Sequence, residues 1–119
     1  MTTRPKNPIY YGGRIFRPVE IKGDSETTSE TIFIYQQDHD LVTATYSGGD
    51  IAYGQLMGVI QRDGSLDMRY HHRSKMGVLM TGKCHTVPET LPSGKLRLHE
   101  TWQWTSPDQS SGTSILEEF

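Results

Sequence analysis

Glu100 is the residue of this 119-residue chain whose position most suggests chemistry. It interrupts an apolar series with every-second-residue spacing, which is typical of the buried face of a β-strand. The series consists of Leu96, Leu98, Trp102 and Trp104. An isolated carboxylate in an apolar interior is very costly, so Glu100 must be paired, hydrogen-bonded or neutral. A carboxyl group of raised pKa at this position would serve as an acid, a base or an anchor for a ligand.

The segment 65–73 supplies two more inward polar groups, Tyr70 and His72. They continue the every-second-residue series that Leu66 and Met68 begin, and the residues that alternate with this series are polar or charged. We therefore predict an interior cluster of Glu100, His72 and Tyr70, which are the candidate catalytic residues if the protein is an enzyme. The alternative is a structural network that fixes the pairing of the strands, or a position at the barrel mouth where Glu100 meets water.

Hairpin turns determine which other side chains face this cluster. Asp63-Gly64 and Gly48-Gly49 have the composition of two-residue hairpin loops. Pairing through the first turn places Met57 opposite Tyr70, Gln55 opposite His72 and Val59 opposite Met68. The register between 78–87 and 95–104 places Glu100 opposite Gly82. Val42, Ala44, Ile51 and Tyr53 are then inward as well. The predicted ligand contacts are Tyr46, Tyr53, Gln55, Met57, Tyr70, His72, Glu100 and Trp102.

The elements that position these residues all resemble strands. Alternating patterns occur at 14–19, 31–37, 41–47, 50–61, 65–73, 78–87, 95–104 and 113–119, with a possible short strand at 8–11. The face of 31–37 stays open between Phe33 with Tyr35 and Ile32 with Ile34. About eight sequential hairpin strands favour an all-β, up-and-down antiparallel barrel, because closure leaves no exposed edge. A two-sheet β-sandwich is the alternative. We expect one domain over 1–119, with 1–8 as a loose tail.

Several classes of function are not expected. The net charge of −2 and the pI near 6.2 do not favour binding to nucleic acid. No apolar run approaches the roughly 18 residues of a membrane span, and no leader pattern is present. The lone Cys84 fits a reducing cytoplasm. His71 and His72 point to opposite faces of a strand, so we predict no metal site. No cofactor motif is found, and monomer and dimer both stay open.

Three segments of the chain resemble a family of short, uncharacterised bacterial proteins. They are Ala44-Thr45-Tyr46-Ser47-Gly48-Gly49, Met80-Thr81-Gly82-Lys83-Cys84, and the run from Leu98 to Ser106. The resemblance extends from about Tyr11 to Glu118 and implies a calycin-like, lipocalin-like β-barrel. Some members are labelled N-acetylglutamate synthase. We do not expect that activity, because acetyl-coenzyme A is usually held at a helix N-terminus, and the glycines here are predicted in hairpins.

The prediction for function is a cytoplasmic, noncatalytic β-barrel that binds a small apolar or amphipathic ligand in a partly apolar interior. One alternative is a small enzyme in which Glu100 is the general acid or base, together with Tyr70 or His72. A second alternative is a filled barrel that acts as an interaction module. The interior volume separates the first two hypotheses from the third.

Overall fold

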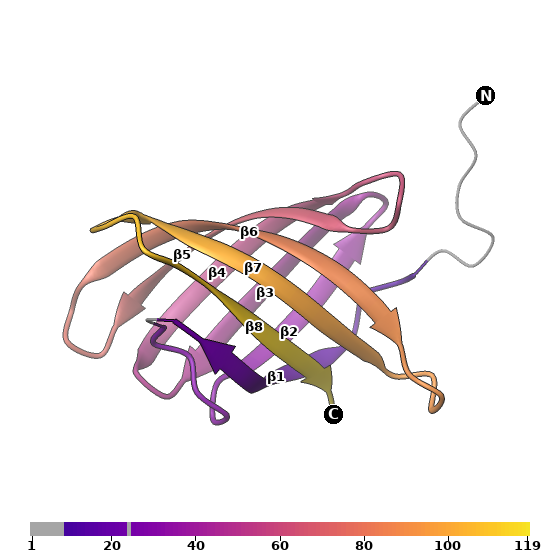
Figure 1. Ribbon diagram of the computed structural model, residues 1–119, viewed down its shortest axis with the longest axis horizontal. Coiled ribbons are helices and arrows are strands. Elements are labelled where there is room, and N and C mark those ends of the chain that lie inside the picture. Colours follow the sequence, from indigo (N-terminus) through magenta and orange to yellow (C-terminus); the bar gives the residue numbers. More distant parts are fainter. Residues whose placement is uncertain (1–8, 24) are drawn as a thin grey trace.

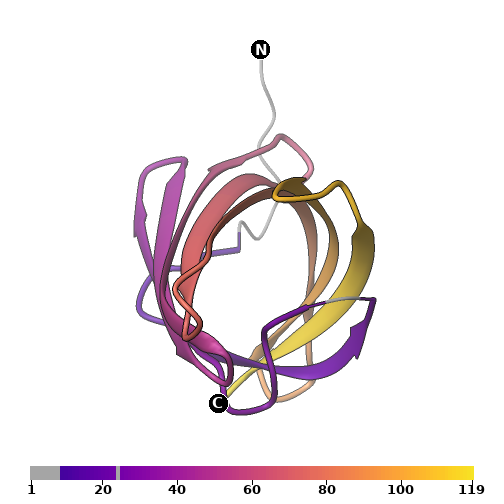
Figure 2. The ribbon, with the colours of Figure 1, turned by 90° about the vertical axis from the view of Figure 1, so that its left-hand side faces the viewer.

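The protein is a closed antiparallel β-barrel. The computed structural model describes residues 9–23 and 25–119, and within them eight strands follow one another around the barrel until β8 pairs with β1 (Figures 1 and 2). The strands are β1 (Ile15–Lys22), β2 (Ile32–Asp38), β3 (Leu41–Gly48), β4 (Ile51–Ile60), β5 (Leu66–Ser74), β6 (Leu79–Thr90), β7 (Leu96–Ser106) and β8 (Ser111–Glu118). The predicted barrel of about eight strands is confirmed, and the sandwich alternative is wrong.

Two sequence predictions concern the N-terminal region. Residues 9–11 form no strand, so the possible short strand at 8–11 is not found over these positions. Residue 8, and with it the whole tail predicted for 1–8, lies outside the described residues. A helix long and apolar enough to cross a membrane does not occur in the part of the chain that is described.

The β4–β5 hairpin differs from the predicted two-residue loop. The Gln61 N–H donates to the Ser65 carbonyl at 2.8 Å, and the Gly64 N–H donates to the Gln61 carbonyl at 2.9 Å. Gly64 has a φ of 87°, in the left-handed region. A type I turn followed by a left-handed residue forms a three-residue loop, here Arg62, Asp63 and Gly64.

The longer loop shifts the pairing by one residue. Gly58 pairs with Met68 in place of Val59, and Leu56 pairs with Tyr70 in place of Met57. Because a one-residue shift moves every side chain to the other face, the predicted inward positions of four β4 residues are wrong. Tyr53 and Met57 are 52% and 58% exposed, and Gln55 and Val59 are exposed as well.

The start of β4 nevertheless faces inward. Gly48 pairs with Ile51 around the loop Gly49-Asp50, and the register shifts again between Ile51 and Tyr53. This irregularity adds one residue to β4, so Ile51 is buried as predicted although Tyr53 is not. On the preceding strand, the inward predictions for Val42, Ala44 and Tyr46 are confirmed.

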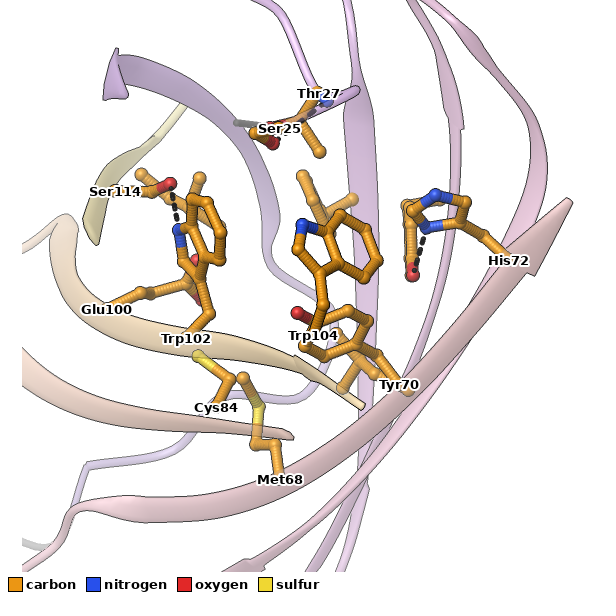
Figure 3. Close-up of a pocket in the computed structure, with 14 residues that line it drawn as sticks. Ser25, Thr27, Met68, Tyr70, His72, Cys84, Glu100, Trp102, Trp104 and Ser114 are labelled. Carbon is orange, nitrogen blue, oxygen red and sulfur yellow. Dashed lines mark hydrogen bonds between the residues drawn. The ribbon is translucent and has the colours of Figure 1, made fainter. Parts of the chain in front are cut away.

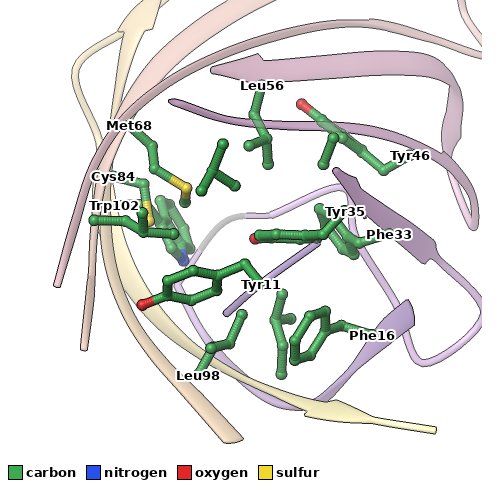
Figure 4. Close-up of a cluster of buried hydrophobic side chains, with 14 of the residues drawn as sticks. Tyr11, Phe16, Phe33, Tyr35, Tyr46, Leu56, Met68, Cys84, Leu98 and Trp102 are labelled. Atoms are coloured by element: carbon green, nitrogen blue, oxygen red, sulfur yellow. The ribbon is translucent and has the colours of Figure 1, made fainter. Parts of the chain in front are cut away.

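Aromatic side chains fill the end of the barrel beside the β4–β5 loop. Tyr11 crosses this end, and its hydroxyl donates to the Gly64 carbonyl at 2.7 Å. Tyr35 lies beneath it, with ring centroids 6.4 Å apart, and the Phe16 ring packs edge-on against Tyr35 (Figure 4). Tyr35 and Phe33 are both buried, which settles the open choice of face on β2. Free space in the interior therefore lies toward the opposite end.

Candidate ligand-binding cavity

A cavity of about 50 Å³ lies inside the barrel, toward the end where the segment between β1 and β2 folds over it (Figure 3). This is space for roughly three to five water molecules at about 10–15 Å³ each. The interior is therefore neither packed solid nor widely open. The lining residues come from every strand except β1, together with that segment. They are Ser25, Thr27, Phe33, Tyr46, Leu56, Met68, Tyr70, His72, Cys84, Glu100, Trp102, Trp104, Ser114 and Leu116.

Glycines opposite the large side chains shape the cavity walls. Tyr46 pairs with Gly54 on β4, and Trp102 pairs with Gly112 on β8. In both pairs the ring lies so close to the glycine backbone that a Cβ there would overlap it. The same relation holds for Met68 with Gly58 and for Tyr70 with Gly82. The large groups thus lie along the wall, because their cross-strand partners have no side chain.

A chain of hydrogen bonds runs from the barrel wall to the segment between β1 and β2. The Tyr46 hydroxyl lies 3.0 Å from His72 Nδ1, and His72 Nε2 lies 2.8 Å from Glu26 Oε1. Burial lowers the pKa of His72, against the opposing effect of its hydrogen bond to Glu26. A neutral imidazole has one donor and one acceptor nitrogen, so Nε2–H donates to Glu26 Oε1 and Nδ1 accepts from Tyr46. His72 thereby fastens this segment over the cavity.

Glu100 lies deeper in the barrel and has little hydrogen bonding. Thr86 Oγ1 donates to Glu100 Oε2 at 3.4 Å, and the described residues provide this carboxyl group with no other hydrogen bond. Burial raises the pKa of Glu100 to about 8, and the bond from Thr86 only partly opposes that shift. Glu100 is therefore mostly protonated at neutral pH, as the sequence argument required of an unpaired interior carboxyl group.

The register around Glu100 differs from the prediction. Glu100 pairs with Thr86 on β6 and with Ser114 on β8, whereas Gly82 pairs with Trp104. The predicted opposition of Glu100 and Gly82 is therefore wrong. The shift equals an even number of residues, so the inward direction of Glu100 is unaffected.

A second deep polar group lies near Glu100. The Tyr35 hydroxyl is fully buried and has no hydrogen-bond partner among the described residues. Burial raises the pKa of this phenol, and the charge of Glu100 raises it further. In Figure 4 the Tyr35 hydroxyl points across the barrel interior toward the side of Trp102 and Cys84. Buried polar groups are usually satisfied, so this hydroxyl is an unused donor in the interior.

Five of the eight predicted contact residues line the cavity, namely Tyr46, Tyr70, His72, Glu100 and Trp102. The other three, Tyr53, Gln55 and Met57, lie on the outer face of β4. In the described structure no hydrogen bond joins Glu100 to Tyr70 or His72, so the three candidate catalytic residues share a cavity without forming a bonded cluster. The roles assigned to the five lining residues stay predictions.

Sequence reasoning missed several residues of the site. Glu26, Ser25 and Thr27 belong to a segment with no alternating pattern, and nothing local indicates that it returns to the barrel interior. Thr86 could have been found from the alternating pattern of β6, because Thr86 and Cys84 are both buried on the same face of this strand. Among the described residues, no group of three or more histidine, cysteine or acidic side chains is arranged to hold a metal ion.

The fold and cavity together define the class of the protein: an up-and-down antiparallel barrel with a small, mainly apolar interior cavity. Comparison with protein families is more specific. The model of the family described as "Avidin-like protein" matches residues 9–119, and the chain belongs to that family. This assignment fits the calycin-like barrel that the sequence resemblance implied. Comparisons with curated proteins and with solved structures found no match.

Proposed function

We propose that this protein binds a small molecule in the interior of its barrel without transforming it. The observation that carries the proposal is a cavity with aromatic walls and few polar groups, one of which, Glu100, has unused hydrogen-bonding capacity. Such a combination of apolar walls and sparse polar groups is typical of ligand sites. Membership of the Avidin-like family supports the proposal, since members of that family bind small ligands, biotin among them.

The cavity volume limits the size of the ligand. At about 50 Å³ it is far below the roughly 300–1,000 Å³ of sites for drug-sized ligands. A molecule of a few heavy atoms fits the described structure. A ligand as large as biotin would require the segment that carries Ser25, Glu26 and Thr27 to move, with loss of the bond between Glu26 and His72.

Native mass spectrometry of protein purified from its native host tests the proposal directly. We expect a stoichiometric small molecule on the protein, which denaturing extraction would release for identification. Thermal unfolding with and without excess biotin is the companion measurement, because a ligand at 100 times its Kd stabilises the folded state by about 2.7 kcal/mol. An apo mass, together with no stabilisation by biotin or by the cavity probes described below, would contradict the proposal.

A second candidate is a small enzyme that uses Glu100 as a general acid. The raised pKa of Glu100, about 8, favours it, because efficient proton donors have pKa values near the working pH. Glu100→Gln distinguishes the two functions once a ligand is known. An enzyme loses turnover by orders of magnitude while it still binds the ligand. A binding protein shows only a change in affinity.

A further inference from the structure

We infer that the interior cavity selects a small organic cation, such as a protonated amine, whose charge lies between the Glu100 carboxylate and the aromatic walls. The inference rests on the proposed small-molecule binding and names the ligand class for the same cavity. Its support comes from the charges of the lining residues, from the arrangement of the rings, and from the unused polar capacity around Glu100.

The charges of the cavity are of one sign. Among the lining residues that the structure describes, none is lysine or arginine, and Glu100 is the one carboxylic acid. A second carboxylate, Glu26, lies at the rim and is bonded to His72. Burial favours the neutral form of His72, so the imidazole adds no positive charge at neutral pH. An anionic group in this cavity would meet no cation and would face a carboxyl group, whereas a cation finds a partner.

The rings of the cavity supply a second attraction for a cation. Trp104 lies at the centre of the ring cluster, 5.4 Å from Tyr70 and 6.1 Å from Trp102 between centroids. Figure 3 shows Glu100 beside Trp102, and Tyr70 beside Trp104. An ammonium group within about 6 Å of a ring centroid is attracted by the negative face of the ring, most strongly for tryptophan. An ammonium ion in this cavity therefore has aromatic rings and a carboxylate within reach together.

The carboxyl group of Glu100 has capacity for this ligand. An ionised carboxylate offers about four acceptor sites, and Thr86 occupies one of them at 3.4 Å. One or two N–H donors of an ammonium ion would bind to the sites that remain. Binding then requires Glu100 to be ionised. At pH 7 Glu100 releases its proton to the buffer as the cation enters. The ammonium ion thus replaces a proton, and the total charge of the cavity does not change.

Glu100 is the group whose titration governs this exchange. The titratable groups that face it from the other strands are phenols and a thiol, and the pKa of each is raised by burial, so all of them stay neutral between pH 7 and 9. They are Tyr35 on β2, Tyr46 on β3, Tyr70 on β5 and Cys84 on β6. Its direct neighbours Thr86 and Ser114 do not titrate in this range. At the rim, His72 is hydrogen-bonded to Glu26, and burial favours the neutral form of the imidazole.

The test is a titration of the Trp102 and Trp104 indole N–H signals by NMR. The probes are ethylammonium, 1-propanol as a neutral molecule one carbon longer, and propionate as an anion. At pH 9 we expect ethylammonium to bind at least tenfold more tightly than 1-propanol, and propionate not to bind. From pH 9 to pH 7 the affinity for ethylammonium should fall about tenfold, because the Glu100 proton must then be displaced. Ethylammonium itself stays protonated at both pH values.

Glu100→Gln keeps the shape of the side chain and removes its charge. In this variant the preference for ethylammonium and its pH dependence should disappear, while binding of 1-propanol stays. Glu30→Gln, which changes an exposed carboxylate outside the cavity, is the matched control and should behave as the unchanged protein.

The outcomes separate the inference from the proposed function. Equal affinities for ethylammonium and 1-propanol at pH 9, or tighter binding of propionate, would overturn the cation inference and leave small-molecule binding intact. If no probe shifts either indole signal, the cation inference fails; an apo mass and no stabilisation by biotin would then contradict the proposed small-molecule binding as well. A pH-independent affinity for ethylammonium would also overturn the role of Glu100.

Discussion

The phenol ring of Tyr70 lies directly against the backbone of Gly82, its partner across the β5–β6 ladder. A Cβ at position 82 would overlap the ring carbons and the hydroxyl oxygen. Because glycine leaves that space free, the ring occupies the barrel wall and part of the interior stays open. Tyr46 has the same relation to Gly54 on β4. The pattern of glycines and aromatic residues therefore sets how much free space the barrel retains.

Gly82→Ala should destabilise the protein. Alanine is intrinsically better than glycine inside a strand by about 0.5–1 kcal/mol, but overpacking against Tyr70 should outweigh this gain and cost about 1–3 kcal/mol. Urea unfolding measures the free-energy change. The matched experiment repeats the substitution in a Tyr70→Ala background, where the collision is absent and the cost should disappear. An equal cost in both backgrounds would show that the ring is not the cause.

Trp102→Ala should cost about 3–5 kcal/mol in the free energy of unfolding, as is usual for loss of a large core side chain. The indole is 6% exposed, and its Nε1–H donates to Ser114 Oγ at 2.9 Å. Met57→Ala is the control on the outer face of β4, where the side chain is 58% exposed and the expected change is within about 0.5 kcal/mol. A loss below about 1 kcal/mol for Trp102→Ala would contradict the inward position of this residue.

Local alternation was sufficient to predict the inward residues of β5 and β7. Tyr70, His72 and Glu100 follow from the two-residue period of a strand, which does not depend on distant pairing. The face of β4 could not be obtained in this way, because it depended on whether the loop at Asp63-Gly64 holds two or three residues. An Asp-Gly pair suits both loop types, since each requires a left-handed residue at the glycine.

The pairing partner of Glu100 and the contact of Glu26 with His72 could not be predicted from the alternating pattern of a single strand either. The strand predicted at 78–87 was expected to end before Pro88, but β6 continues through this proline to Thr90. The ladder with β5 ends at Thr86, so β6 is an edge strand at Pro88 and tolerates the missing N–H. Glu26 reaches His72 across 46 positions of sequence through a segment without regular structure, and tertiary packing alone determines that contact.

Substitution of Glu26 should loosen the segment that covers the cavity. Glu26→Ala leaves the buried His72 Nε2 without its partner at 2.8 Å, and an unsatisfied buried donor costs about 1–3 kcal/mol. Glu26→Gln keeps an acceptor oxygen and should cost less than about 1 kcal/mol. Hydrogen exchange of the Asp50 N–H, which donates to the Glu26 carbonyl at 3.3 Å, reports on the segment. It should quicken in the alanine variant more than in the glutamine variant, and equal exchange in the two variants would argue against a tether through His72.

Glu100 should make the protein less stable as the pH rises. Its pKa is raised from 4.5 to about 8 in the folded state, so folding favours the protonated form. The associated stability is fully present below about pH 4.5 and is lost progressively until the pH exceeds about 8. The total loss is on the order of a few kcal/mol.

Glu100→Gln removes the titration, so the variant should become more stable than the unchanged protein by pH 9, whereas the control Glu30→Gln should not. The lowered pKa of His72 acts in the opposite direction, at acid pH, and is common to all three proteins. Urea unfolding at pH 5, 7 and 9 measures the difference, and parallel pH profiles for the unchanged protein and Glu100→Gln would show that the interior carboxyl group does not titrate as proposed.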